Sequence, residues 1–255
     1  MKVRRRAVVA WGLVGLGGML PLGRIAAASE QRLVTANLPP FAIEDQSEHR
    51  GALVEVAEAV LARAGFPARA EFFPWARSQL LVAQGSRVLI VPLARTPERE
   101  AQYQWLLKLY TVHQQFIKQQ GEPRIQSFDQ ARSLRVGVLR GSPDLAILRR
   151  QQFADERIVQ AASAIDLLRL LERHHVDVIF GADIIYATVS STRPGLQLSP
   201  GARLGSTDIW LAGGAGFDAE DRQRLAAAHA ALLKDGSIER IFRRYGLRPA
   251  PEDLR

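Results

Sequence analysis

Residues 88–100 read VLIVPLARTPERE and decide the fold of the chain around them. The apolar run 88–91 predicts a buried strand, because short β-branched runs bounded by breakers are typical of parallel sheets. Thr96 and Pro97 predict a helix start, since a Thr hydroxyl can cap free N–H groups and Pro loses no hydrogen bond at the first helical position. Ligands of α/β proteins bind where a strand leads into a helix N-terminus. We therefore expect Arg99 to hold an anionic group there.

The chain on both sides of this stretch alternates between strand-like and helix-like patterns. We expect strands at 31–37, 68–73, 134–139 and 176–180, and helices at 52–64, 74–84, 163–172, 218–234 and 238–245, with two more directly after 140–143 and 181–183. This alternation predicts an α/β fold in which mostly parallel sheets are flanked by helices. The extended runs 103–119 and 207–212 separate two such series. We therefore predict two lobes joined by two crossover strands.

The first 28 residues have the layout of a cleavable signal peptide. Lys2 and the arginines at 4–6 form a basic start, residues 7–22 are apolar, and three alanines at 26–28 precede Ser29. The apolar part is shorter than the roughly 20 residues of a membrane span. We expect export to the periplasm by the general or the twin-arginine route, with an uncleaved N-terminal anchor as the alternative.

The charge and composition of the remaining chain exclude several classes of site. Five of the 34 lysines and arginines and none of the 26 acidic residues lie in residues 1–28, so 29 basic and 26 acidic residues remain, a net charge of +3. This small excess gives no support to nucleic-acid binding. The chain has no cysteine, and its five histidines form no metal-ligand motif. We predict no metal, no cofactor and no catalytic residues.

Six segments in order carry a resemblance to a known family. They are PPF at 39–41, the helix at 51–65, RTPERE at 95–100, LRVGVLRGS at 134–142, DVIFGAD at 177–183 and KDGSIERIFRRYG at 234–246. The chain resembles periplasmic solute-binding proteins of the polar amino-acid-binding type, bacterial extracellular solute-binding protein family 3. PWAR at 74–77 beside ARTPERE is similar to a divergent branch of that family.

The resemblance implies a fold, a domain division and partners. The expected fold is the type II periplasmic-binding-protein fold, with the two crossover strands as its hinge. Lobe 1 is expected to comprise residues 29–112 and 213–255, and lobe 2 residues 113–212. A small-molecule ligand, such as an amino acid or organic acid, is the expected partner of a monomer. An ABC permease or a membrane sensor would read the closed form.

The resemblance also implies a set of ligand-binding residues. Arg99 corresponds to the arginine that holds the ligand's carboxylate, and a guanidinium suits this role because its fixed fork makes two parallel bonds. The opposing lobe would supply Gly141 and Ser142 to the same carboxylate. Trp75 is expected to stack on the ligand or to fill the core. Asp183 is expected to meet the ligand's amino group or to cap a helix.

Two further candidates lie beside this set, and the sequence departs from the family there. Arg77 of PWAR is a possible ligand contact or a solvated surface residue. Ala94 stands on the loop before Arg99, where amino-acid binders of the family usually carry hydroxyls, and Pro92 on the same loop also lacks one. Leu38 replaces an aromatic residue that often precedes the PF pair. A carboxylate ligand is therefore favoured over a standard amino acid.

We expect a solute-binding protein that captures a small carboxylate-bearing, amino-acid-like solute by hinge closure, for ABC-type uptake or sensing. The main alternative is a small exported enzyme, dehydratase-like, on the same scaffold. It needs a cleft carboxylate with a raised pKa, for which Glu44 or Asp183 could serve. An effector domain of a transcription regulator and a scaffold that has lost binding are the remaining alternatives.

Overall fold

The computed structural model describes residues 31–44, 49–191, 193 and 195–248, and the predicted signal peptide lies outside them. Within these residues, eight strands form one sheet in the order β2-β1-β3-β8-β4-β7-β5-β6. The strands are β1 (Arg32–Thr35), β2 (Ala70–Phe72), β3 (Val88–Ala94), β4 (Gln104–Gln119), β5 (Val136–Leu139), β6 (Ile158–Ala161), β7 (Val178–Ala182) and β8 (Leu198–Gly213). The helices are α1 (Ala52–Arg63), α2 (Trp75–Gln84), α3 (Phe128–Ala131), α4 (Asp144–Arg150), α5 (Ala164–Glu172), α6 (Asp183–Ser191), α7 (Ala219–Lys234) and α8 (Ser237–Arg244).

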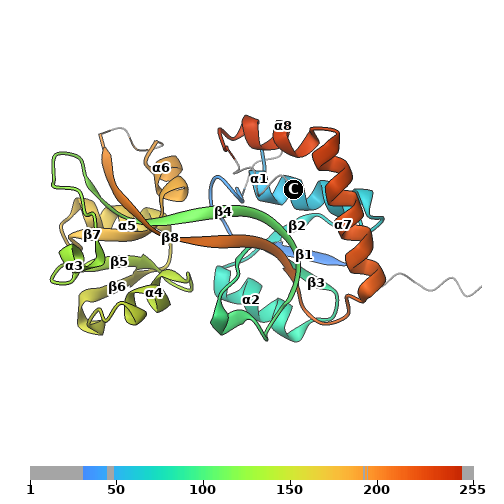
Figure 1. Ribbon diagram of the computed structural model, residues 1–255, viewed down its shortest axis with the longest axis horizontal. Coiled ribbons are helices and arrows are strands. Elements are labelled where there is room, and N and C mark those ends of the chain that lie inside the picture. Colours follow the sequence, from blue (N-terminus) through green and yellow to red (C-terminus); the bar gives the residue numbers. More distant parts are fainter. Residues whose placement is uncertain (1–30, 45–48, 192, 194, 249–255) are drawn as a thin grey trace, which may run out of the picture.

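The sheet divides into two parallel sets joined by two long antiparallel strands. β2, β1 and β3 pair in parallel at one end, and β6, β5 and β7 pair in parallel at the other. β4 and β8 pair with each other and run the length of the molecule between the two ends (Figure 1). Each end is thus an α/β lobe, and the predicted two-lobed fold with two crossover strands is confirmed.

Each lobe has its own helices and hydrophobic core. Helices α1, α7 and α8 pack over one face of the first lobe around Leu53, Val60 and Phe242, and α2 covers the other face. Helices α3 to α6 surround the second lobe, whose two cores contain Phe180 and Leu167. None of the helices in the described ranges combines the length and the apolar character needed to cross a membrane.

The helix start predicted at Thr96 and Pro97 is present, but the helix is only a three-residue 3-10 helix, η1 (Pro97–Arg99), and the Thr96 side chain makes no cap. Strand β3 continues to Ala94. Pro92 does not end the strand, because it lies where the pairing with β8 shifts register and the ladder requires no N–H from it.

Two elements were not predicted, and one strand is longer than expected. β6 and α3 were absent from the sequence expectations, and β8 begins at Leu198 instead of 207. The first half of β8 reads LSPGARLGS, whose Pro and Gly residues hide a strand pattern. Hydrogen bonding to β4 stabilises this half of β8, although its local sequence has a low strand propensity.

Candidate functional site

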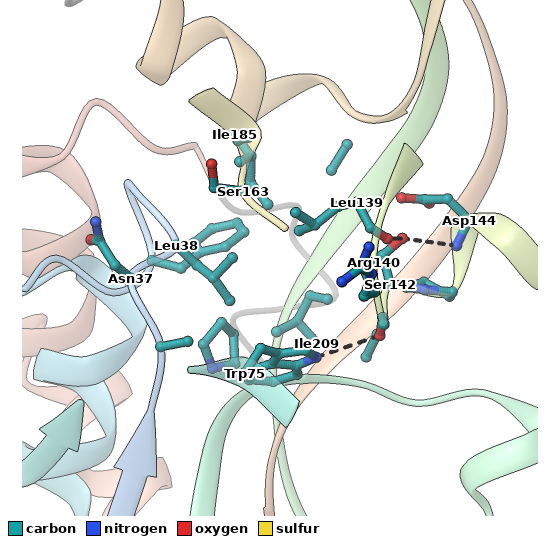
Figure 2. A pocket seen from close by; sticks show the side chains of 18 of the residues that line it. Asn37, Leu38, Trp75, Leu139, Arg140, Ser142, Asp144, Ser163, Ile185 and Ile209 are labelled. Atoms are coloured by element: carbon teal, nitrogen blue, oxygen red, sulfur yellow. Dashed lines mark hydrogen bonds between the residues drawn. The ribbon is translucent and has the colours of Figure 1, made fainter. Parts of the chain in front are cut away.

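A cavity of about 480 Å³ lies between the two lobes (Figure 2). Its walls come from the loops that follow β1, β2 and β3 in one lobe and β5, β6 and β7 in the other, and β4 and β8 close it from behind. The carboxyl ends of parallel strands from both lobes therefore meet at one place. Such a crevice is where open α/β sheets bind their ligands.

Apolar side chains form most of the cavity wall. Figure 2 shows Leu38 and Trp75 of the first lobe opposite Leu139 and Ile185 of the second. The further apolar residues that line the cavity are Ala36, Phe41, Phe72, Phe73, Pro74, Pro92, Ala94, Val112, Pro143, Ala162, Ala164, Ala182 and Ile209. A ligand with an apolar body can replace water here at a gain in free energy.

Arg99 places a guanidinium in this apolar cavity. Its Nη2 donates to the Gly141 carbonyl oxygen of the opposite lobe at 2.6 Å, and its Nη1 donates to the Ala94 carbonyl oxygen at 3.2 Å. Burial lowers the pKa of Arg99, although the side chain stays charged at neutral pH. Among the described residues no carboxylate forms a direct ion pair with it, and its hydrogen bonds go to carbonyl oxygens, so its charge can be shared with an anion.

Trp75 and Gly141 bring the two lobes into contact. The Trp75 Nε1 donates to the Gly141 carbonyl oxygen at 3.4 Å, so this oxygen accepts from two lobe-1 side chains. Gly141 has a φ of 77°, and a Cβ there would lie 3.0 Å from the Trp75 Cδ1. Only glycine fits this turn without strain and without pressing on the indole.

Ser142 and Asp144 form the polar wall of the second lobe. The Ser142 hydroxyl donates to the Leu139 carbonyl oxygen at 2.8 Å and accepts from the Asp144 backbone N–H at 3.3 Å. Asp144 is 5% exposed, and burial raises the pKa of its carboxyl to about 7, against the opposing effects of the Ser142 hydroxyl and the Arg99 charge. Burial also raises the pKa of Tyr186, and the nearby Asp144 adds to the shift.

Five of the predicted ligand-binding residues line the cavity: Trp75, Ala94, Arg99, Gly141 and Ser142. Arg77 and Asp183 do not line it, which corrects their expected position. The Arg77 guanidinium lies over the Phe73 ring, 5.1 Å from its centroid. The Asp183 carboxylate accepts the Ile184 backbone N–H at 2.8 Å at the start of α6, and the helical turn then directs Ile185 and Tyr186 to the cavity instead.

Sequence reasoning missed seven polar residues that line the cavity: Asn37, Gln114, Arg140, Asp144, Ser163, Tyr186 and Thr207. Gln114 lies on β4, is 1% exposed, and donates through Nε2 to the Thr207 hydroxyl on β8 at 2.8 Å. Asp144 had one usable signal, since an acid two residues after a Gly-Ser turn falls in the first turn of the following helix. Arg140 had a similar signal, since it directly precedes that turn. The other five carry no local signal, because only the tertiary fold brings them to the cavity.

Arg95 and two tryptophans pack together outside the cavity. Arg95 lies outside the cavity, pairs with Glu100 at 2.5 Å, and stacks over the Trp210 ring at 4.7 Å. Trp105 packs edge-on against Trp210 with ring centroids 6.2 Å apart. In the part of the chain that the structure describes, no three His, Asp or Glu side chains gather as metal ligands.

Comparison with solved structures finds proteins of this fold. The chain is similar to a histidine kinase sensor domain that resembles periplasmic binding proteins, with 20% identity, 87% of this chain and 98% of that chain covered, and a TM-score of 0.78. It is also similar to the arginine-, lysine-, histidine-binding protein ArtJ from Geobacillus stearothermophilus, with 16% identity, 88% and 99% covered, and a TM-score of 0.78. The GluR0 ligand-binding core from Nostoc punctiforme, in complex with L-glutamate, gives 15% identity, 84% and 98% covered, and a TM-score of 0.72. At such low sequence identities, these similarities establish the fold of the chain and nothing about its ligand.

A search of curated protein sequences found no match. The model of the bacterial extracellular solute-binding proteins, family 3, matches residues 32–248. That match includes both lobes, both crossover strands and every residue of the cavity described above. The chain therefore belongs to the bacterial extracellular solute-binding proteins of family 3.

Proposed function

We propose that the chain captures a small carboxylate-bearing, amino-acid-like solute in the cavity between its lobes by hinge closure. The observation that carries this proposal is the half-buried Arg99 guanidinium, which faces the Gly141 carbonyl across the cleft with no carboxylate ion-pair partner among the described residues. A ligand carboxylate can accept from Arg99 and from the Gly141 backbone N–H, and from the Ser142 hydroxyl once that hydroxyl turns away from the Leu139 carbonyl oxygen. Trp75 is then placed to stack on the apolar part of the solute.

The same geometry supports different roles for the two lobes, docking of the ligand by one and closure by the other. We take lobe 1 as residues 29–112 and 213–255 and lobe 2 as residues 113–212. The ligand docks on lobe 1, and lobe 2 closes about the middle of β4 and β8, where Val112 pairs with Thr207. The affinity of the ligand for the closed form over the open form drives this closure.

The protein acts in the periplasm in this proposal, after removal of the signal peptide at residues 1–28. The closed form is read by an ABC permease or by a membrane sensor, and the chain works as a monomer. The similarity to a histidine kinase sensor domain fits sensing, and the similarity to amino-acid-binding proteins fits uptake. No covalent chemistry is assigned, since family and fold are those of binding proteins.

A thermal-shift screen tests the proposal. The panel contains the standard amino acids, small mono- and dicarboxylates, and matched amides and alcohols that lack the carboxylate. A ligand at 100 times its dissociation constant adds about 2.7 kcal/mol to the free energy of unfolding, which raises the melting temperature measurably. Carboxylates are expected to shift it and their amides are not. A panel without any shift overturns the proposal, and mass spectrometry of the bound ligand shows whether it is recovered unchanged.

Arg99→Ala is the matching test on the protein. Removal of a buried charge partner is expected to weaken carboxylate binding by about 2–5 kcal/mol, or roughly 30-fold or more. Arg95→Ala is the control, because Arg95 lies in the same segment but outside the cavity. If the carboxylate affinity of Arg99→Ala stays within threefold of that of the unchanged protein, Arg99 does not hold the ligand's carboxylate.

A further inference from the structure

We propose that Asp144 is a ligand-binding residue that acts as a protonated acid and donates a hydrogen bond to the anionic group held by Arg99, so that ligand capture takes up a proton. This inference deepens the proposed function and rests on it. It adds a neutral, titratable hydrogen-bond donor to the site and couples affinity to pH.

The position of Asp144 carries the argument. It is the first residue of α4, its side chain lines the cavity, and it lies on the same wall as Ser142 (Figure 2). It is 5% exposed, and no arginine or lysine of the described residues forms an ion pair with its carboxyl. A carboxyl buried in this way without a cationic partner is driven toward the neutral form.

The titratable and charged groups around Asp144 are few. Arg99 faces it from lobe 1, and Tyr186 faces it from α6. Arg140 lines the same cavity from the turn before α4, and the exposed Glu44 lines it from lobe 1. On α4 itself, Arg149 pairs with Asp155 at 2.9 Å and Arg150 pairs with Glu98 at 2.7 Å, both at the exposed surface. Arg99 favours the ionised carboxyl, and burial opposes this more strongly, which leaves the pKa of Asp144 at about 7.

A bound anion changes this balance in one direction. A ligand carboxylate at Arg99 brings a second negative charge close to Asp144, and two like charges in one site do not both stay ionised. The ligand is the stronger acid, with an ordinary carboxyl pKa of about 4, so Asp144 keeps the proton. The O–H of Asp144 then donates to the ligand oxygen, and the proton comes from solvent wherever Asp144 was ionised before binding.

The opposite role makes the opposite prediction. An ionised Asp144 could accept from an ammonium group of the ligand, as the sequence suggested for Asp183. Binding would then strengthen as the pH rises and Asp144 ionises. The sign of the pH dependence therefore separates the two roles.

Calorimetric titration with 3-phenylpropionate tests the proposal. This probe has an apolar body that suits the cavity and a single carboxylate that stays ionised above pH 6. With the pKa of Asp144 at about 7, the protonated fraction falls from roughly 0.9 at pH 6 to roughly 0.03 at pH 8.5, so affinity is expected to fall about 30-fold. Titrations at pH 7.5 in buffers of different ionisation enthalpy are expected to show proton uptake.

Asp144→Asn is the decisive variant, because its amide keeps the shape and a donor but does not titrate. Its affinity is expected to stay within threefold between pH 6 and pH 8.5. The control is Asp129→Asn, an exposed acid-to-amide change in the same lobe that is expected to keep the full pH dependence. If Asp144→Asn does not fold, the ¹³C shift of the Asp144 carboxyl in the unchanged protein still reports its protonation with and without probe.

Three results would overturn the inference. They are an affinity that does not fall with rising pH, a carboxyl of Asp144 that is ionised at pH 6 in the probe complex, and no binding of 3-phenylpropionate at pH 6. In the first two cases the probe binds and the proposed function stands. In the third case the carboxylate screen decides separately whether the proposed function survives.

Discussion

The two walls of the cleft, one from each lobe (the jaws), carry ionisable groups of opposite kind. Lobe 1 presents Arg99, a permanent cation that already donates to two carbonyl oxygens. Lobe 2 presents Asp144, an acid with no cationic partner, whose charge depends on pH. The strand order is the same in both lobes, with each parallel set of three joined to a crossover strand. The jaws therefore differ through the residues at their strand ends and not through their folds, and each difference can be removed by one substitution.

Asp144→Asn is expected to have the largest effect on stability. Burial raises the folded-state pKa from 3.8 to about 7, so the folded protein binds more protons than the unfolded chain between these values and loses stability as the pH rises through them. At about 1.36 kcal/mol per pKa unit, the penalty reaches up to about 4 kcal/mol above pH 7. The amide escapes this penalty, so the variant should be more stable at pH 8 and nearly unchanged at pH 4.

Urea unfolding at pH 4, 6 and 8 measures this difference between the variant and the unchanged protein. All other titrating groups cancel in the comparison. Asp155→Asn is the contrasting variant, because Arg149 holds the pKa of Asp155 below its usual value and its carboxylate is exposed. It should not gain stability as the pH rises. A gain for Asp144→Asn that does not grow from pH 4 to pH 8 would contradict the assignment.

The pattern of elements was readable from the sequence because local periodicity and tertiary burial agree there. The α1 spacing of Leu53, Val56 and Val60 points all three into the core, and Asp218 caps α7 as expected. The sequence failed where pairing overrides local signals. Pro92 lies inside a strand because a register shift removes the need for its N–H in the ladder, and only a three-residue 3-10 helix follows Thr96.

The candidate site was predictable only where one residue type suits one geometry. Gly141 and Arg99 are of this kind, since a positive φ calls for glycine and an anion calls for a fixed guanidinium fork. The position of Asp144 had a signal in the Gly-Ser turn before it, but its raised pKa had none, because that depends on burial by the tertiary fold. Asp183 looked like the acid of the second jaw, yet its carboxylate caps its own helix. Residue type alone does not tell these two acids apart.

Gly141→Ala is expected to have an intermediate effect on the contact between the jaws. The left-handed conformation costs an alanine about 1–2 kcal/mol, and the new Cβ meets the Trp75 indole at 3.0 Å. Gly121→Ala is the matched control in the same lobe, with a φ of 94° and no atom within 4 Å of the added Cβ. Both variants should lose similar stability in urea unfolding, but only Gly141→Ala should also lose about tenfold in carboxylate affinity. Equal affinities would show that the Trp75–Gly141 contact does not contribute to closure.

Arg150→Ala is expected to have the smallest effect, although it removes a visible bridge between the jaws. Arg150 of α4 and Glu98 of η1 lie 2.7 Å apart across the cleft, but their side chains are 53% and 52% exposed. Water and salt screen such a pair, which limits it to about 0.2–1 kcal/mol, or less than about a fivefold change in affinity. A double-mutant cycle with Glu98→Ala, measured by calorimetry at low and high salt, isolates the pair. A coupling above 2 kcal/mol that persists at high salt would mean that this rim pair, and not the contacts of Arg99 and Trp75 with the Gly141 carbonyl, holds the lobes together.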